Sequence, residues 1–466
     1  MITKIEIDGF KTFDNFSMEF APLVIIAGPN GSGKSNLFDA LLLISSIAEK
    51  DLKEAFSQQR GDARELFTQI ANTESTNQIK FAVELFIDQK VKDDWSTEKE
   101  LSHTRLRYEI AIERQADSKS GIEKLFVRNE ILKPIEKQKD KWVKRFIRDD
   151  FWKPSKRSHN YKPYINTEIK NGIPTISLRQ DGPRGGKPTP AKEIERTILS
   201  GVNSADFPHA FAVRKEFLNW KLLHLNPIQM REPSPILGPD KVDEDGKYLP
   251  SMLRRLEIEE PGILKDISRS IQNILPNIQS VRIDEDKSRQ QFVLFAKSTD
   301  NREFSSRVLS EGTLRILLLS ALKYDERHSG LLCFEEPENG IHPFRMKNML
   351  HLLKDLTTDL NSEEDSKLPL RQVIINTHSH LLVKEYFEEE DYHKGLFYYA
   401  NLVSQTSSKL KSAYKITRLN PVHIGKTKDM FPNLLPAERA FTHSEVIEYL
   451  LTEDAETNSI IEKLKI

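Results

Sequence analysis

Residues 28–35 constrain the fold of this chain more than any other segment, because they read Gly-Pro-Asn-Gly-Ser-Gly-Lys-Ser. The apolar run Leu23–Ala27 precedes them and is typical of a buried strand. From residue 35 onward, apolar residues recur with helical spacing. A glycine-rich turn between a strand and a helix brings backbone N–H groups and a helix N-terminus around an anion, whereas an ordinary glycine turn needs no such flanks. The segment therefore predicts an α/β fold with a phosphate-binding loop.

The same loop predicts which groups would bind a nucleotide. The Lys34 ammonium is expected to reach the β- and γ-phosphates, and the Ser35 hydroxyl is expected to hold Mg²⁺. We therefore expect the chain to bind ATP together with Mg²⁺. The expected nucleotide-contacting residues of this loop are Gly28, Asn30, Gly31, Ser32, Gly33, Lys34, Ser35 and Asn36.

Composition limits the other classes of function. The chain has 466 residues, enough for two or three lobes, and its formal net charge of −1 gives no global attraction to nucleic acid or anionic membranes. Its single cysteine, Cys333, leaves no internal disulfide to form. The sequence shows no secretory signal and no apolar run near the ~20 residues that span a bilayer. We therefore expect a cytoplasmic protein without a membrane partner.

Residues 121–200 differ in composition from the rest of the chain. They contain 19 Lys and Arg against 10 Asp and Glu, a net of +9. Two interpretations are open: a surface for a phosphate backbone or a partner protein, or an amphipathic helical insertion whose rings form a small core. Residues 171–190 are rich in Gly and Pro and predict a loop or linker. The interleaved rings and bases are Trp142, Lys144, Arg145, Phe146, Arg148, Phe151, Trp152, Lys153, Lys156, Arg157, Tyr161, Lys162 and Tyr164.

Two apolar strands in the second half end in polar residues suited to hydrolysis. The first, residues 331–336, ends in Glu335 and Glu336. Because side chains alternate along a strand, one carboxylate would face a metal ion and the other an attacking water. The second strand, residues 372–377, precedes His378. The alternatives are a helix-capping carboxylate for Glu336 and a packing role for His378.

In their order along the chain, these motifs resemble the ATP-binding-cassette (ABC) superfamily, in the branch that includes SMC, RecF and OLD-type ATPases. The resemblance assigns residues 28–35 to Walker A and the Leu-Ser-Glu-Gly-Thr sequence of residues 309–313 to the signature motif. It also assigns residues 331–336 to Walker B and residues 339–342 to the D-loop. It implies catalytic roles for Lys34, for Glu336 as general base and for His378 at the γ-phosphate, with Ser35 and Glu335 as the Mg²⁺ ligands.

The resemblance also implies self-assembly. In such ATPases the signature Ser and Gly of one subunit contact the γ-phosphate that is held by the P-loop of another. Ser310 and Gly312 would therefore complete the ATP site of a second copy, in a head-to-tail homodimer or a higher homo-oligomer.

Two residues depart from the family pattern. Glu335 replaces the usual metal-binding Asp and has a longer side chain, and Glu311 stands where Gly is common. Gln58 and Gln69 are both candidates for the Q-loop glutamine, and the sequence favours neither.

Several other polar residues receive plainer interpretations. Cys333 lies mid-strand and is expected to be a buried apolar residue. For His342, a D-loop role and a packing role are equally favoured. Arg231 and Arg315 could reach phosphate, but surface ion pairing is the favoured prediction for both. The acidic run at residues 388–391 is expected to be a solvated loop or helix end.

The fold expected from the resemblance is an α/β ABC-type P-loop ATPase head with a mixed β-sheet and a large, mainly helical insertion. Residues 1–115 would form the N-terminal lobe with Walker A, and residues 116–290 the basic insertion. Residues 291–466 would form the C-terminal lobe with the signature motif, Walker B, the switch histidine and a C-terminal extension.

The motifs also look like the stand-alone ATPases of bacterial anti-phage systems such as PARIS, which are encoded beside a TOPRIM-like nuclease. Fewer than a hundred residues follow His378, which leaves no room for such a nuclease in this chain. We therefore expect an ATPase that acts as the sensor or scaffold subunit of a defence complex and controls a separate effector. The alternative is an SMC- or RecF-like ATPase that binds DNA in repair or chromosome maintenance. A transporter cassette is disfavoured by the large insertion.

Overall fold

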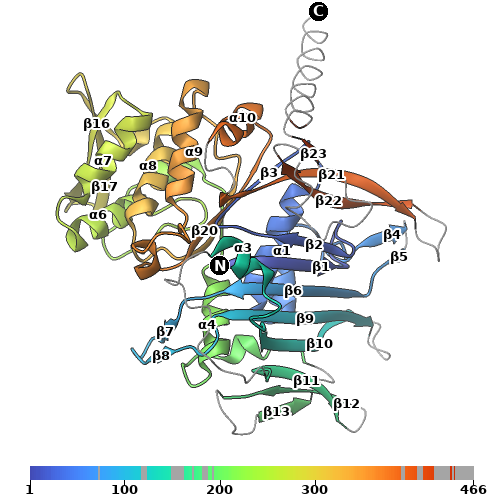
Figure 1. Ribbon diagram of the computed structural model, residues 1–466. Coiled ribbons are helices and arrows are strands. Elements are labelled where there is room, and N and C mark those ends of the chain that lie inside the picture. Colours follow the sequence, from blue (N-terminus) through green and yellow to red (C-terminus); the bar gives the residue numbers. More distant parts are fainter. Residues whose placement is uncertain are drawn as a thin grey trace, which may run out of the picture.

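Two large sheets, one antiparallel and one mostly parallel, organise the chain in the computed structural model (Figure 1). The α/β class with a mixed sheet is thereby confirmed. The residues that the structure describes are 1–71, 74–116, 123–147, 162–170, 173–180, 187–190, 194–389, 394–406, 413–423, 441–442 and 446.

The mostly parallel sheet has seven strands and contains the P-loop strand at its centre. Its order is β14 (Lys221–Leu223), β19 (Gly330–Glu335), β20 (Arg371–Thr377), β3 (Leu23–Ala27), β21 (Leu396–Thr406), β22 (Ala413–His423) and β23 (Phe441–Thr442). The strands from β14 to β21 run parallel, and β22 is antiparallel to β21. Every residue of β3 and β20 is buried, as expected for strands covered on both faces.

Side-chain alternation sends the central strands into two separate cores. Val24 and Ile26 face the core that contains α1 (Lys34–Ile47) and the antiparallel sheet. Leu23 and Ile25 face the core that contains α8 (Glu311–Tyr324), α9 (Met346–Asp355) and α10 (His380–Glu388). The parallel sheet therefore lies between the P-loop helix on one face and the signature helix on the other.

The antiparallel sheet has eight strands. Its apolar face packs on the core that contains α1, which we call the first core. Its order is β13 (Lys187–Pro190), β12 (Ile173–Leu178), β11 (Ile165–Lys170), β10 (Glu123–Pro134), β9 (Arg105–Ala116), β6 (Gln78–Phe86), β1 (Ile2–Asp8) and β2 (Phe16–Glu19). The opposite face carries cross-strand ion pairs such as Arg107 with Glu6 (2.6 Å) and with Glu84 (3.2 Å). This balance of charge makes the open face a solvated surface.

Shorter elements complete the description. The remaining helices are α2 (Leu52–Ser57), α3 (Lys141–Phe146), α4 (Pro208–Leu218), α5 (Pro227–Arg231), α6 (Leu249–Glu259), α7 (Ile263–Ile274) and the single turns η1 (Leu199–Gly201), η2 (Ser306–Val308), η3 (Pro343–Arg345) and η4 (Asp365–Lys367). The remaining strands are β4 (Gln69–Ala71), β5 (Glu74–Ser75), β7 (Lys90–Lys92), β8 (Glu98–Glu100), β15 (Ser234–Pro235), β16 (Ile278–Asp286), β17 (Gln291–Ser298) and β18 (Glu303–Ser305). Among the helices described, none is both long and apolar enough to cross a lipid bilayer.

The insertion differs from expectation in its first half. Helices α4, α6 and α7 fit the predicted helical character, but residues 123–190 contribute the four strands β10–β13. Strand β10 pairs with β9 along its whole length, so the sheet of the N-terminal lobe continues into the insertion. The prediction of a loop over residues 171–190 is wrong for β12 and β13, because the pairing of β12 with β11 and of β13 with β12 outweighs local Gly and Pro content. The division of the chain at residues 115 and 290 stays a prediction.

The described rings of the basic segment lie in the core. Trp142 is 5% exposed, and its indole N–H donates to the Phe20 carbonyl oxygen at 2.6 Å. Phe146 is also buried, and the Tyr164 ring stacks on His209 with centroids 4.1 Å apart. These three rings support the core interpretation, although they join the first core rather than forming one of their own. The other candidates between residues 148 and 161 lie outside the described residues.

Candidate functional site

The P-loop connects β3 to α1 and encloses the Lys34 side chain. The Lys34 Nζ donates to the carbonyl oxygens of Gly28 (2.6 Å) and Pro29 (2.8 Å). Gly31 and Gly33 have φ values of +77° and +90°, which favour glycine. At Gly33 a Cβ would also lie 1.9 Å from the Thr417 hydroxyl oxygen. The loop therefore has the glycine-dependent curvature that brings backbone N–H groups to a phosphate.

A hydroxyl network supports the loop from behind. Thr417 Oγ1 lies 3.1 Å from the Ser32 carbonyl oxygen and 2.6 Å from Thr12 Oγ1, and the Asn36 amide donates to Thr12 Oγ1 at 2.8 Å. Asn36 is thus engaged within the protein, while Asn30 at the loop tip is exposed. The Ser32 hydroxyl is buried and has no hydrogen-bond partner within the described part of the chain. Thr12 and Thr417 were not predicted, because no local pattern links residues so far apart in sequence.

Strand register brings the motifs together at one edge of the parallel sheet. Glu335 is the register partner of Asn376, and Thr377 is the partner of Ala27, the last residue before the P-loop. The Glu336 N–H donates to the Asn376 carbonyl oxygen at 2.9 Å. Because parallel strands end at the same edge, the Walker B carboxylates, the switch histidine and the P-loop open onto one surface.

Glu336 and His378 form a direct pair at this edge. Their side chains meet at 2.8 Å between Oε1 and Nδ1, and are 34% and 43% exposed. The Asn339 amide donates to the other carboxylate oxygen of Glu336, also at 2.8 Å. Glu336 has φ +48°, a left-handed conformation that is strained for a side chain of this size. The carboxylate is therefore held from two sides and reaches solvent, as a base for a water molecule requires.

Glu335 offers the carboxylate that fits a metal ion. Its Oε1 accepts from the Asn376 amide at 3.2 Å, and its Oε2 lies 3.9 Å from His224 Nδ1. No group of three or more His, Cys, Asp or Glu that could hold a metal occurs among the described residues. Mg²⁺ would accordingly use the Ser35 hydroxyl and one carboxylate together with phosphate and water oxygens, the usual arrangement for this ion.

The signature motif starts α8 and packs on the D-loop. Ser310 is the N-cap residue, and its exposed hydroxyl accepts from the Thr313 N–H at 3.2 Å. A Cβ on buried Gly312 would lie only 2.3 Å from the Gly340 carbonyl oxygen. The glycine therefore permits close contact with the D-loop, and the serine remains at the surface beside a helix N-terminus.

Arg231 and Arg315 have roles that differ from the predicted surface ion pairs. Arg231 donates from Nε and Nη2 to the Leu309 carbonyl oxygen, at 3.2 and 3.1 Å. Arg315 is 8% exposed; it pairs with Glu311 at 2.7 Å and donates from Nη1 to the Glu336 carbonyl oxygen at 3.3 Å. The expectation was wrong for Arg231, whose guanidinium binds a backbone carbonyl, whereas Arg315 does form an ion pair but is buried rather than at the surface. The unusual Glu311 thus serves as the carboxylate partner of Arg315.

Arg60 is a further basic residue of this region that the motifs did not predict. It pairs with Asp39 of α1 at 2.8 Å, and Lys11 pairs with the same carboxylate at 2.7 Å. The hydrogen bond to Asp39 raises the pKa of Arg60, and the charge of Glu335 contributes in the same direction. The Arg60 side chain is 65% exposed and lies within electrostatic reach of Glu335.

The remaining candidates lie apart from this edge or keep a packing role. Cys333 is buried, and burial raises the pKa of its thiol, which confirms the apolar interpretation. His342 is exposed and stacks on Phe344 with centroids 5.4 Å apart. Gln58 bonds with Lys50, and Gln69 lies in the β4–β5 hairpin, so neither gains support as the Q-loop glutamine.

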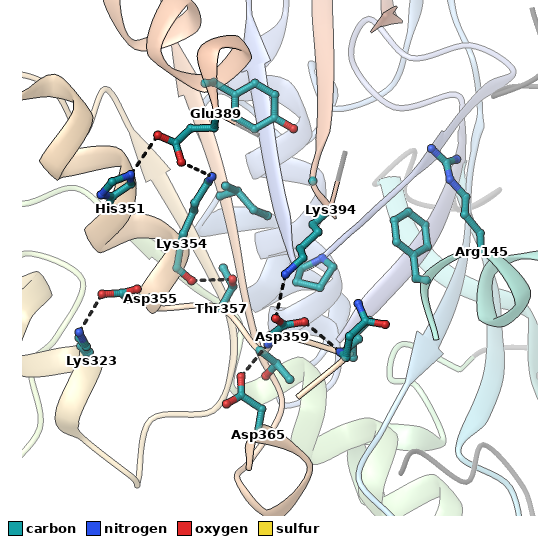
Figure 2. Close-up of a pocket in the computed structure, with 18 residues that line it drawn as sticks. Arg145, Lys323, His351, Lys354, Asp355, Thr357, Asp359, Asp365, Glu389 and Lys394 are labelled. Carbon is teal, nitrogen blue, oxygen red and sulfur yellow. Dashed lines mark hydrogen bonds and ion pairs between the residues drawn. The ribbon is translucent and has the colours of Figure 1, made fainter. Parts of the chain in front are cut away.

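The acidic run begins at the end of α10 and borders a cavity of about 700 Å³ (Figure 2). Glu389 pairs there with Lys354 (3.1 Å) and His351 (3.0 Å), and Lys394 pairs with Asp359 (3.1 Å). Residues 390–391 lie outside the described residues. This cavity is beside the amino ends of β3 and β21, opposite to the P-loop edge, and its labelled lysines, Lys323, Lys354 and Lys394, each pair with an acid of its own lining.

Comparison with known proteins finds similarity to AAA domains in two segments of the chain. Residues 4–171 match a family model described as "AAA domain". Residues 184–384 match one described as "AAA domain, putative AbiEii toxin, Type IV TA system". The chain is similar to AAA domains in both halves. Together the two matches support an ATPase. No curated protein matches the chain.

Similar solved structures include three SMC head domains. The SMC head bound to the C-winged helix domain of ScpA shares 14% identity, with a TM-score of 0.44, over 90% of this chain and 97% of that one. The SMC head domain from Thermotoga maritima shares 13% identity, with a TM-score of 0.36, over 91% and 99%. The head with an extended coiled coil, bound to the C-terminal domain of ScpA from Pyrococcus furiosus, shares 12%, with a TM-score of 0.42, over 90% and 96%.

Proposed function

We propose that this chain is an ABC-type ATPase that hydrolyses ATP to ADP and phosphate as a head-to-tail homodimer or higher homo-oligomer. The observation that carries the proposal is the register of β19, β20 and β3. It gathers the P-loop, both Walker B carboxylates and His378 at one sheet edge, although the P-loop precedes the other two segments by about 300 residues. The similarity to AAA domains over both halves of the chain supports the same activity.

Each residue of the edge has a distinct part in the proposed reaction. The P-loop amides and Lys34 bind the β- and γ-phosphates, and Ser35 and Glu335 hold Mg²⁺. When bound, Mg²⁺ neutralises charge on the phosphate oxygens. Glu336 accepts a proton from water as the water oxygen attacks the γ-phosphorus and the bond to the β–γ bridging oxygen breaks. His378, hydrogen-bonded to Glu336, orients that carboxylate and faces the γ-phosphate.

Assembly in trans would complete this site. Ser310 presents its hydroxyl at the N-terminus of α8, on a surface that a second copy can reach. Two large apolar side chains flank the signature motif and the D-loop: Val308 is 67% exposed and Phe344 is 93% exposed. Exposed apolar groups beside a polar site are typical of an interface. The second copy would cover them while bringing Ser310 and Gly312 to the γ-phosphate.

The decisive experiment separates ATP binding from hydrolysis. We expect Glu336→Gln to bind ATP as tightly as the wild type but to release phosphate at least about a hundredfold more slowly, because the proton acceptor is lost. Lys34→Ala should lose ATP affinity, and Ser310→Arg should bind ATP but fail to hydrolyse it. Fluorescent-nucleotide titration and phosphate release measure the two steps. Unchanged turnover in Glu336→Gln would contradict the assignment of the base.

The biological role that we propose is the sensor or scaffold subunit of an anti-phage complex that controls a separate effector, a TOPRIM-like nuclease. The family model that matches residues 184–384 is named for a toxin of a toxin–antitoxin system, which supports a role in defence. Co-expression with neighbouring genes, followed by phage plating and affinity purification, tests this role. Protection that needs Lys34 and a co-purified nuclease is the expected result; protection without a partner would contradict it.

A DNA-binding SMC- or RecF-like ATPase is the second candidate, and the net charge of +9 over residues 121–200 favours it. Against it, Trp142, Phe146 and Tyr164 are buried and cannot stack on bases. A DNA-binding titration over increasing salt separates the two candidates. A steep loss of affinity with salt would indicate many phosphate contacts, whereas weak binding at physiological salt would favour protein docking.

A further inference from the structure

Behind the exposed pair of Glu336 and His378 lies a second pair that is buried. Glu338 Oε1 is hydrogen-bonded to Thr377 Oγ1, and the two residues are 7% and 0% exposed. Glu338 belongs to the turn that follows Glu336, and Thr377 directly precedes His378. The two turns that carry the proposed base and the switch histidine are therefore joined twice, once at the surface and once in the interior.

The Thr377 hydroxyl fixes the backbone on both sides of His378. It accepts from the Ser379 N–H at 2.9 Å while bonding with Glu338. The Ser379 hydroxyl in turn accepts from the Leu382 N–H at 3.3 Å and caps α10. A displacement of the Thr377 hydroxyl would therefore also move the backbone at His378 and at the start of α10.

The turn on the other side is equally well connected. The Asn339 N–H donates to the Glu336 carbonyl oxygen at 3.1 Å, and the Ile341 N–H donates to the Glu338 carbonyl oxygen at 2.9 Å. Glu338 is therefore the buried point of a tight turn whose first residue is Glu336. Because that residue has a left-handed φ of +48°, its position depends on contacts made by the rest of the turn.

Burying the Glu338 carboxyl costs desolvation free energy, which a residue that only fills space would not require. Its Oε2 is buried and has no hydrogen-bond partner in the described part of the chain. Burial raises the pKa of this carboxyl, against the opposing effect of the Thr377 hydrogen bond. An apolar side chain of similar size would fill the space without leaving a polar atom unsatisfied. The carboxyl therefore points to a requirement for the bond itself.

We propose that Glu338 is a positioning residue for ATP hydrolysis, whose buried bond to Thr377 locks the D-loop turn to the turn that carries His378. The lock sets the separation of Glu336 and His378 when nucleotide binds and a second copy brings its signature motif to the γ-phosphate. The inference rests on the proposed function, because it assigns a role in the same reaction.

Two pairs of variants test the lock. We expect Glu338→Ala and Thr377→Val to lower kcat about tenfold while KM for ATP stays within about twofold, because misplacement affects the reacting geometry more than binding. Glu338→Gln and Thr377→Ser retain a bonding group and should keep kcat within about threefold of the wild type. The double variant Glu338→Ala/Thr377→Val should be no slower than either single variant, because both remove the same contact.

Thr358→Val provides a matched control beside the first residue of β20, outside the strand itself. The Thr358 hydroxyl is also buried and accepts from the Arg371 N–H at 2.8 Å, but it lies at the opposite end of β20. This variant should lower stability without lowering kcat. If Glu338→Ala does not fold, comparing kcat of Thr377→Val with kcat of Thr377→Ser tests the lock instead.

The outcomes distinguish the lock from the proposed function. A wild-type chain that binds ATP but never hydrolyses it would overturn the proposed function, and the lock with it. A wild-type chain that hydrolyses ATP, with kcat unchanged in Glu338→Ala and Thr377→Val, would overturn the lock alone. Equal losses in Glu338→Ala and Glu338→Gln, or additive losses in the double variant, would also overturn it.

Discussion

At the scale of single residues, the site depends on groups whose neighbours are fixed by close contact. Gly28 and Gly33 of the P-loop approach other segments so closely that no side chain fits, and the Glu338 carboxylate is buried and hydrogen-bonded. Substitutions at such residues can be tested against controls, because the chain also contains residues of the same type in open surroundings.

The two P-loop glycines Gly31 and Gly33 form one such test. Both have positive φ, so alanine costs about 1–2 kcal/mol of backbone strain at either position. A Cβ at Gly33 meets the Thr417 hydroxyl oxygen at 1.9 Å, whereas a Cβ at Gly31 has nothing within 4 Å. We expect Gly33→Ala to lose at least about tenfold more ATP affinity than Gly31→Ala, because the loop itself must move. Equal affinities of the two variants for a fluorescent ATP analogue would contradict this structure of the loop.

Glu130 of β10 predicts a dependence of stability on pH. Complete burial raises its pKa to about 7, despite hydrogen bonds from the Leu199 and Ile198 N–H groups and the Tyr108 hydroxyl. The folded state therefore binds a proton that the unfolded state, with a pKa of 4.5, releases, so this group's contribution to stability falls as pH rises from about 4.5 to about 7. Glu130→Gln should flatten the profile of Tm against pH over that range. Glu123→Gln, at the exposed end of the same strand, should leave the profile unchanged.

At the scale of elements, helix α8 begins near the proposed catalytic edge and contacts it at two points. The signature helix α8 touches the D-loop through Gly312 and holds the Glu336 carbonyl through Arg315. A second copy that pushes on α8 would therefore act directly on the proposed base. This arrangement gives the unusual Glu311 of the signature motif a physical role as the partner of Arg315.

Gly312→Ala tests this contact between elements. Its Cβ would lie 2.3 Å from the Gly340 carbonyl oxygen, so α8 and the D-loop must separate. We expect kcat to fall at least about tenfold while the affinity of the chain's own P-loop for ATP is retained. Gly201→Ala is the control, because its Cβ has nothing within 4 Å and its φ is not in the left-handed region. Normal phosphate release by Gly312→Ala would show that the contact is dispensable.

At the scale of the whole molecule, the proposed assembly makes each ATP site depend on two copies. The P-loop of one chain would then form one ATP site of the dimer, and the exposed signature serine of the same chain would form part of the other. This dependence can be measured without a structure of the dimer, because two inactive variants with defects in different motifs complement each other.

Mixing Lys34→Ala with Ser310→Arg tests the assembly. Each variant alone should be inactive, since every site in its homodimer carries a defect. In a mixed dimer one site combines both defects and the other has neither, so equal amounts should recover about one quarter of wild-type turnover. Phosphate release from the mixture, against each variant at the same total concentration, gives the result. No recovery, with dimers confirmed by light scattering, would contradict the head-to-tail arrangement.

The sequence by itself determined the parts of this protein that depend on local pattern. The P-loop, the strand before it and the paired carboxylates at the end of an apolar strand were all predicted, because periodicity, glycine spacing and motif order are visible along the chain. Only the tertiary structure decided that strands β10–β13 extend the first sheet, that Arg231 and Arg315 bind backbone carbonyls, that Thr12 and Thr417 contact the P-loop region, and that Glu338 bonds with Thr377. These features arise from pairing and burial between distant segments, and a side chain's local sequence does not specify which distant group it will meet.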